Sequence, residues 1–242
     1  MAHAIHEFRP YQMLRTLYRN ARTTAIRLKR SILGTDKKII ADYFASHDVR
    51  GLHIGCGQHL IEGFINADLS SSSKDVLNFD ATKLFPFGDE SFDFIFSEHM
   101  VEHIPYADGL HMLRECCRVL KKGGKITVST ADVERVTALG RADRTELQND
   151  YIAWSIGKFS SLSPDNDPAF VINNFFRDWG HQFIYAEQTL AASLERCGFA
   201  EVTKYPINHS GTPALRDLEN QARMPEGFLA LETLTLEATK HA

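Results

Sequence analysis

A glycine turn followed by an acidic residue is the first feature of this sequence that could do chemistry. The stretch 52–68 reads LHIGCGQHLIEGFINAD, and Gly55, Cys56 and Gly57 interrupt what the apolar residues predict to be two strands. Glycine tolerates positive φ and lets a ligand lie against bare backbone. Asp68 ends the second predicted strand, where a carboxylate can accept hydrogen bonds from a ribose diol. The stretch therefore predicts a nucleoside site at the carboxyl edge of a parallel sheet.

The turn lacks the features of a dinucleotide site. Such a site has a third glycine, a following helix, and an acid about 20 residues further on. Here Gln58 follows Gly57, and Asp68 comes 13 positions after Gly55. A pyrophosphate needs the amide-rich start of a helix, for which this segment has little room. A nucleoside without phosphates is the better candidate.

The residues after the turn extend the pattern. The strings are DAT (80–82), LFPF (84–87), SFDFIFS (91–97), EHI (102–104) and LRECCRVLKKGG (113–124). With them, the chain resembles the class I S-adenosylmethionine-dependent methyltransferases, in the branch with a shortened first crossover. The resemblance covers residues 50–130, and GHQFIYAEQTLAASLERCGF (180–199) and TLTLEATK (233–240) extend it. The missing third glycine and first helix depart from the family pattern.

The resemblance implies an α/β fold, with a Rossmann-like, doubly wound sheet of seven strands, the last one antiparallel, flanked by helices. It implies methyl transfer as the activity and S-adenosyl-L-methionine as the cofactor. Asp80 would lie near the adenine, where its carboxylate can accept from the exocyclic amine. The implied cofactor-binding residues are Gly55, Cys56, Gly57, Asp68, Leu69, Asp80, Ala81, Ser97, Glu98 and His99.

Three histidines on the expected rim could act on the methyl acceptor. If the acceptor is a hydroxyl, a base must take its proton, and histidine is the usual group. The candidate catalytic residues are therefore His99, His103 and His181. The other histidines, His3, His6 and His241 among them, have no such context and are expected at the surface. The fold does not decide the acceptor, so a small molecule, a sugar or a lipid remains open, with a hydroxyl oxygen favoured.

The string HMVEH (99–103) has other interpretations. It matches the HxxEH motif of a class of zinc hydrolases, which would make His99, Glu102 and His103 metal ligands. Apart from His99, it also resembles the Glu-x-x-Glu-His string of metal-assisted O-methyltransferases. Short motifs often match by chance, and Glu102 and His103 can brace the turn before Pro105 without a metal. We expect no metal; a further alternative is a nucleoside-binding or scaffold protein without turnover.

Composition places the chain among ordinary globular proteins. It has 242 residues, of which 43% are apolar and 24% charged, as expected for one α/β domain with additions. The four cysteines show no CxxC spacing, which predicts reduced thiols and a cytoplasmic protein. No apolar run of 18 residues predicts a membrane-spanning helix, and the net charge of −4 does not suggest nucleic acid as a partner.

Basic residues concentrate at the amino terminus. Residues 1–33 carry seven basic residues against Glu7 alone, a net charge of +6, which leaves −10 for the rest of the chain. Apolar spacing predicts one amphipathic helix over 10–33, with Leu28 and Ile32 on its inward face. We expect this helix to pack on the domain or on a second subunit of a homo-oligomer. Contact with an anionic membrane surface is the alternative, and an organellar transit segment a further one.

The expected organisation is a helical extension over 1–48 and a methyltransferase domain over 49–242. Residues 133–178 are predicted to be a helical insertion and a lid over the acceptor pocket. Asp36 is expected to cap a helix over 36–46, and Gly123 and Gly124 to end a helix over 106–120. The last strand, 231–239, is expected to point Leu234, Leu236 and Ala238 inward and Thr233, Thr235 and Glu237 outward.

Overall fold

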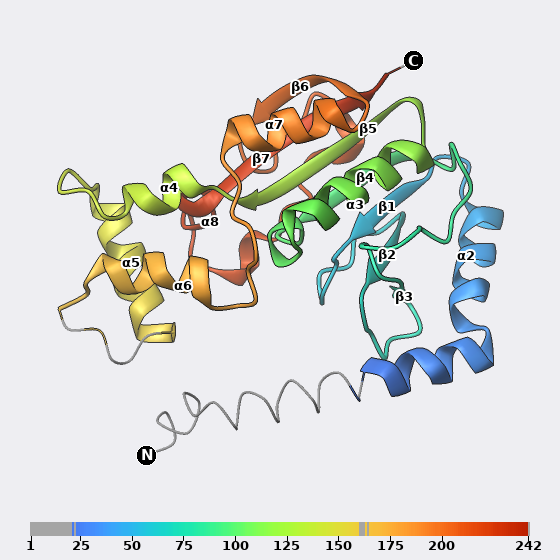
Figure 1. Cartoon of the computed structure of the whole chain (residues 1–242), viewed down its shortest axis with the longest axis horizontal. Coiled ribbons are helices and arrows are strands. Elements are labelled where there is room, and N and C mark those ends of the chain that lie inside the picture. The colour runs from blue at the N-terminus through green and yellow to red at the C-terminus, as the bar shows by residue number, and fades with distance from the viewer. Residues whose placement is uncertain (1–20, 22, 160–162, 164, 242) are drawn as a thin grey trace.

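The computed structural model describes residues 21, 23–159, 163 and 165–241 (Figure 1). Within them, seven strands form one sheet in the order β3-β2-β1-β4-β5-β7-β6. β7 is antiparallel to both β5 and β6, whereas the neighbours from β3 to β5 are parallel. The predicted fold class is confirmed, with its antiparallel last strand. The strands are β1 Gly51–Ile54, β2 Phe64–Asp68, β3 Leu77–Asn78, β4 Phe92–Glu98, β5 Leu120–Ala131, β6 Phe199–Tyr205 and β7 Thr233–Lys240.

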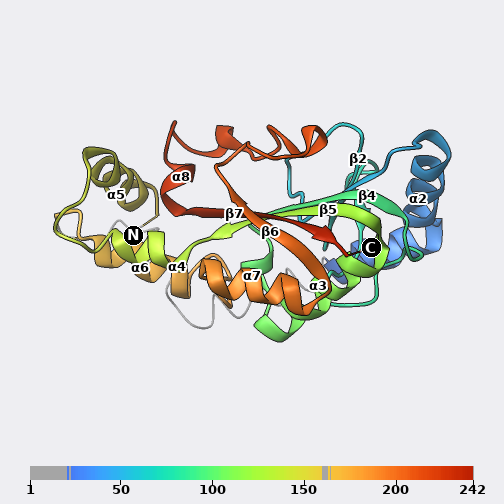
Figure 2. The same cartoon turned by 90° about the horizontal axis from the view of Figure 1, so that it is seen from above.

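Helices α3 and α7 lie against one face of the sheet, and α2 lies beside the end that contains β1 to β3 (Figures 1 and 2). Helices α4 to α6 project beyond the other end of the sheet (Figure 1). The helices are α2 Thr35–Ser46, α3 Tyr106–Val119, α4 Val133–Ala138, α5 Glu146–Phe159, α6 Pro168–Arg177, α7 Glu187–Arg196 and α8 Leu229–Glu232. Short 3-10 turns are η2 Val101–His103, η3 Pro213–Leu215 and η4 Gln221–Arg223.

The main core lies between the sheet and the helices on its first face. Strand alternation sends every second side chain to this face. Leu52 and Ile54 of β1, Ile95 of β4 and Val128 of β5 are among the fully buried residues of this core. Leu234, Leu236 and Ala238 of β7 join them, so their predicted inward orientation is confirmed.

The opposite face of the sheet is covered by a largely irregular segment, residues 206–228, which we call the strap (Figure 2). Its Leu215 packs with Phe96 of β4 and Ile61 of the first crossover. Thr235 and Glu237 of β7 are only 2% and 4% exposed on this side. Their predicted outward orientation was wrong, as was that of Thr233, which is also buried. Alternation reports which face a residue occupies and not what covers that face.

Buried carboxylates hold the strap on the sheet. Glu219 of the strap accepts hydrogen bonds from the Ser129 hydroxyl at 2.9 Å and from the Asn208 amide at 2.8 Å. Burial raises the pKa of Glu219 above its ordinary value. Glu237 of β7 accepts from the Ser210 hydroxyl of the strap. This face of the sheet therefore has a polar core, in contrast to the apolar core on the other side.

The crossover between β1 and β2, residues 55–63, contains no helix, as predicted. Without a helix, the crossover is stabilised by hydrogen bonds to the side chain of Asn66 on β2. Its Oδ1 accepts from the Ile61 amide at 2.8 Å and from His53 Nδ1 at 3.0 Å, and its Nδ2 donates to the carbonyls of Ile61 and Phe64 at 3.0 and 3.1 Å. His53 of β1 is 1% exposed, and burial lowers its pKa to about 4.

The amino-terminal helix differs from its prediction. Residues 21 and 23–33 are helical, and the rest of the predicted segment lies outside the described residues. Leu28 and Ile32 are 61% and 76% exposed, so their expected packing on the domain was wrong. The buried side chain is Arg30, which donates to the carbonyls of Ser73 and Val76 and pairs with Asp36 at 2.6 Å. Among the described helices, none is long and apolar enough to cross a bilayer.

Two predicted helix boundaries were also wrong. Asp36 does not cap α2, because Gly34, at φ 64°, occupies the cap position and Asp36 lies in the first turn. Helix α3 ends at Val119, before Gly123 and Gly124, and β5 starts at the next residue. In both cases the chain turns where tertiary contacts place the following element.

Replacing Asn66 by alanine should lower the free energy of unfolding by about 3 kcal/mol, because buried backbone groups of Ile61 would lose their partners. Chemical denaturation followed by circular dichroism measures this loss. The matched control is Asn173→Ala, whose exposed amide bonds one carbonyl within α6 and should change stability by less than about 0.5 kcal/mol. Equal losses in the two variants would show that Asn66 does not hold the crossover.

Candidate active site

The predicted site residues follow strands that end at one edge of the sheet. Gly55 follows β1, Asp68 ends β2, Asp80 follows β3 and His99 follows β4. These four strands are parallel neighbours, so their carboxyl ends form one rim. In open α/β sheets this rim is where ligands bind.

The glycine turn is tied to the end of β2. The amides of Gly55 and Cys56 both donate to the Ala67 carbonyl, at 2.9 and 3.0 Å. Gly55 has φ 78°, and a Cβ there would lie 2.4 Å from Met100 Cγ, so only glycine fits. Gly57 has φ 53°, but a Cβ there would meet nothing within 4 Å. The turn is therefore closed at Gly55 and open to a ligand at Gly57.

Asp68 braces this turn. Its Oδ2 accepts a hydrogen bond from the Gly57 amide at 2.9 Å. Each carboxylate oxygen has more than one acceptor site, so the same group can still accept from a ribose diol. Asp80 is held in a local turn, since its Oδ1 accepts from the amide and hydroxyl of Thr82 at 3.0 and 2.7 Å. Both aspartates therefore have fixed orientations at the rim.

The remaining predicted cofactor residues differ in burial and in their partners. Cys56 is buried beside the turn, and burial, with the nearby Asp68 carboxylate, raises the pKa of its thiol to about 12. Leu69 is 51% exposed, Ala81 packs against the main core and Ser97 is fully buried. Glu98 accepts from the Asn220 amide of the strap through both oxygens at 3.1 Å. Both carboxylate oxygens of Glu98 are therefore used to hold the strap.

His99 is held at both ring nitrogens. Its Nδ1 lies 2.9 Å from Glu102 Oε1, and its Nε2 shares a hydrogen bond of 2.8 Å with the Thr233 hydroxyl of β7. Its backbone has φ 45°, uncommon for a residue with a side chain, and its amide donates to the Ser129 carbonyl of β5. With both nitrogens engaged, His99 fixes the rim and has no free nitrogen to act as a base.

Glu102 is a buried, ionised carboxylate. It is fully buried, and its Oε2 accepts from the Thr130 hydroxyl at 2.9 Å. Burial alone would raise its pKa, but His99 and His103 favour the ionised form and lower the pKa to about 2. Glu102 therefore carries its negative charge throughout the neutral range.

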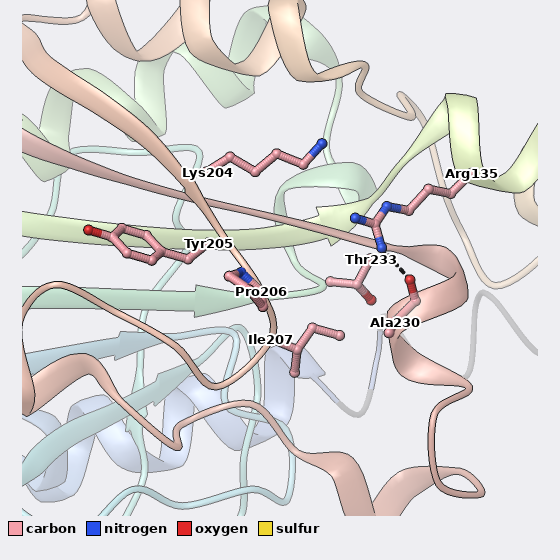
Figure 3. A pocket seen from close by; sticks show the side chains of 7 residues that line it. All are labelled: Arg135, Lys204, Tyr205, Pro206, Ile207, Ala230 and Thr233. Atoms are coloured by element: carbon pink, nitrogen blue, oxygen red, sulfur yellow. Dashed lines mark hydrogen bonds between the residues drawn. The ribbon is translucent and has the colours of Figure 1, made fainter.

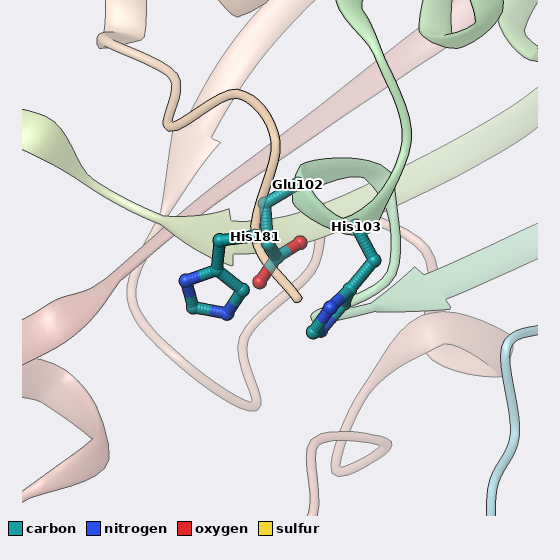
Figure 4. Close-up of side chains that lie close together, drawn as sticks. All are labelled: Glu102, His103 and His181. Carbon is teal, nitrogen blue, oxygen red and sulfur yellow. The ribbon is translucent and has the colours of Figure 1, made fainter. Parts of the chain in front are cut away.

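His103 and His181 stand on either side of Glu102 (Figure 4). Their rings lie 4.7 Å apart between centroids, at 65° to each other. The amide of Gln182 donates to the Glu102 carbonyl at 2.7 Å, which docks the His181 loop on the turn after β4. Nδ1 of His181 donates to the Phe175 carbonyl at 2.8 Å, and burial lowers the pKa of His181, so the ring favours the neutral form.

A cavity of about 330 Å³ is lined in part by Thr233, at the start of β7 (Figure 3). Arg135 and Lys204 bring cations to it, each already paired with a carboxylate, Asp132 and Glu187 respectively. Because the hydroxyl of Thr233 holds His99, this cavity adjoins the histidine cluster. Its lining residues are Arg135, Lys204, Tyr205, Pro206, Ile207, Ala230 and Thr233.

Thr130, Thr233 and Met100 belong to the site but were not identified from the sequence. Thr130 reaches Glu102 because β5 lies beside β4, and Thr233 reaches His99 because β7 begins beside the end of β5. Met100 matters through its contact with Gly55. No spacing pattern marks these three residues, because each acts across strands or loops that are distant in the sequence.

The comparisons with known proteins agree with this geometry. Residues 56–128 match the model of a family described as a methyltransferase domain, a match that runs from the glycine turn into β5. No match to a curated protein was found.

Three solved structures are similar to this chain at low identity. A SAM dependent methyltransferase from Archaeoglobus fulgidus is 18% identical over 95% of this chain and 99% of its own, with a TM-score of 0.49. A putative methyltransferase from Bacillus halodurans is 14% identical over 84% and 98%, with a TM-score of 0.46. A possible histamine N-methyltransferase from Thermotoga maritima is 20% identical over 90% and 97%, with a TM-score of 0.45.

The strand order and the glycine rim define an α/β protein of the class I methyltransferase fold. With the match of residues 56–128, this chain contains an S-adenosylmethionine-dependent methyltransferase domain, and the predicted enzyme class and cofactor are confirmed.

Replacing Glu102 by glutamine should destabilise the protein by about 3 kcal/mol at neutral pH, because His99 would lose its charged partner. The pKa of Glu102 in the folded state lies below its ordinary 4.5. The stabilisation is therefore complete above pH 4.5 and is lost as the pH falls toward about 2. Denaturation of both proteins between pH 7 and pH 3 should show the difference shrinking as the pH falls.

The exposed Glu134 supplies the control for that experiment. Glu134→Gln should follow the wild-type curve at every pH, since no side-chain partner is lost. A difference between wild type and Glu102→Gln that stays constant with pH would contradict an ionised Glu102 with a lowered pKa.

Proposed function

We propose that this methyltransferase transfers its methyl group to a hydroxyl oxygen of a small-molecule acceptor, with sugars and lipids included in that class. The cofactor supplies a methyl group already activated on a sulfonium, so positioning provides most of the catalysis. What an oxygen acceptor needs in addition is a group that takes its proton.

His181 is the observation that carries this proposal. Because its Nδ1 donates to the Phe175 carbonyl, its Nε2 presents a lone pair. Its lowered pKa keeps that lone pair available at neutral pH. His99, by contrast, is engaged at both nitrogens and acts as a positioning residue. Among the three candidate catalytic histidines, His181 is therefore our choice as the base, with His103 beside it.

On the cofactor side, the proposal assigns the adenosine to the open face of Gly57 between Asp68 and Asp80. The absence of any atom within 4 Å of a Cβ at Gly57 supports this, as does the fixed orientation of Asp68. Cys56, Leu69 and Ala81 would line the same space, whereas Glu98 would act through the strap. Ser97 and His99 would hold the end of β4 in place without contacting the adenosine.

On the acceptor side, the proposal makes residues 133–178 a lid within the domain 49–242, with 1–48 as an added extension. Helix α6 of this insertion ends beside His181, and Phe175 and Trp179 contact its ring, with centroids 6.0 and 5.6 Å away. The insertion packs in a second apolar core, which it shares with Ala131 of β5 and Phe228 of the strap.

Isothermal titration should show S-adenosylhomocysteine binding to the wild type, with Asp68→Ala losing at least about tenfold in affinity, because charged hydrogen bonds to the ribose would be absent. Asp68→Asn should lose less, since its amide oxygen can still accept from the Gly57 amide. Asp75→Ala, an exposed acid in the loop after β2, is the control and should bind normally. Full affinity in Asp68→Ala would refute the assigned cofactor position.

The acceptor can be sought by supplying S-adenosylmethionine with an isotope-labelled methyl group together with a fractionated extract of small molecules. Mass spectrometry should find a product that carries the label on oxygen. His181→Asn should lower its rate of formation by at least about a hundredfold while leaving affinity for S-adenosylhomocysteine unchanged. Label found on nitrogen or carbon, or an unaffected rate in His181→Asn, would contradict the proposal.

A further inference from the structure

We propose that Glu102, His103 and His181 bind a divalent transition-metal ion at the rim. One ligand atom from each residue lies within 4.8 Å of the others, and the three come from two loops about 80 residues apart (Figure 4). The set differs from the one that the HxxEH string predicts, because His99 points to Thr233 and His181 takes its place. It also revises the expectation that the chain binds no metal.

The tautomer of His181 is set for coordination. A histidine that binds a metal usually donates its other ring N–H to a carbonyl or carboxylate, which aims the coordinating nitrogen. His181 makes this bond, from Nδ1 to the Phe175 carbonyl at 2.8 Å, so Nε2 presents its lone pair toward Glu102 and His103.

Glu102 is oriented in the same manner. Its Oε2 accepts from the Thr130 hydroxyl and its Oε1 lies 2.9 Å from His99 Nδ1. These contacts fix the plane of a carboxylate that has no water around it, and each oxygen keeps a second acceptor site. The cluster therefore sets one fully buried anion between two imidazoles that are only partly buried.

The chemistry of the donor set indicates the class of ion. Two imidazoles and one carboxylate suit Zn²⁺, Fe²⁺, Mn²⁺ and Co²⁺, and leave coordination positions for other ligands. Ligands of one such ion lie about 3.3 Å apart, from bond lengths of about 2.0–2.1 Å. Rotation of the His103 ring, which makes no hydrogen bond within the described residues, can shorten these distances while His181 keeps its bond to the Phe175 carbonyl.

A metal here would take the Nε2 lone pair of His181 that acts as the base in the metal-free site, and it would keep open positions for the oxygen of an acceptor. That role rests on the proposed function, whereas the binding of the ion does not. In this catalytic role, the ion would polarise the acceptor's hydroxyl group. Because His181 would then be a ligand, the hydroxyl proton would leave to solvent.

The test uses the full chain, stripped of metal with a chelator and titrated with Co²⁺ alone. We expect one Co²⁺ per chain, with the visible absorption of a low-coordinate site that Zn²⁺ displaces. His103→Asn and His181→Asn should each weaken binding at least about tenfold. His209→Asn, an exposed histidine of the strap, is the control and should bind as the wild type does.

No Co²⁺ absorption in the wild type, or equal affinity in wild type and both histidine variants, would overturn the proposal. Circular dichroism of each variant shows whether it is folded, and His181→Asn keeps a side chain that can still donate to the Phe175 carbonyl. Binding of S-adenosylhomocysteine to the same metal-free protein distinguishes failure of the metal proposal from failure of the proposed function. If the protein binds S-adenosylhomocysteine but gives no Co²⁺ signal, the metal proposal is wrong and the cofactor site stands.

Discussion

The buried charge of Glu102 is the interaction on which the rim of this protein depends. An ionised carboxylate without water is stable only with close partners, and here His99, His103 and the Thr130 hydroxyl provide them. Through His99 the same charge reaches Thr233 of β7, and through its backbone carbonyl Glu102 holds the His181 loop. One side chain therefore joins the end of β4 to β5, to β7 and to the entrance of the insertion.

The two faces of the sheet are covered by different kinds of contact. One face packs apolar side chains against helices, with little need for specific polar contacts. The other face is covered by the strap, which has almost no regular structure to satisfy its own backbone. Buried glutamates and hydroxyls meet that need. The shortened first crossover is held in the same way, by a buried amide, Asn66.

Most of the fold could be predicted from residue pattern and order. Apolar runs located the strands of the sheet, and the string 52–68 located the glycine turn that the structure places at the rim. The predictions that were wrong concern what covers a surface. Thr235 and Glu237 read as solvent-facing, and Leu28 and Ile32 as buried, because alternation and helical spacing describe one element without its neighbours.

By itself, the sequence determined which segments form strands, where the glycine turn lies and, through the family resemblance, the class of cofactor. These depend on local conformation and on residues close together in the chain. Only the tertiary structure decided that His181 lies beside Glu102 and His103, and that Glu98 holds the strap. The physical reason is distance along the chain: a side chain takes its role from partners that folding brings to it, and no periodicity encodes a contact across 80 residues.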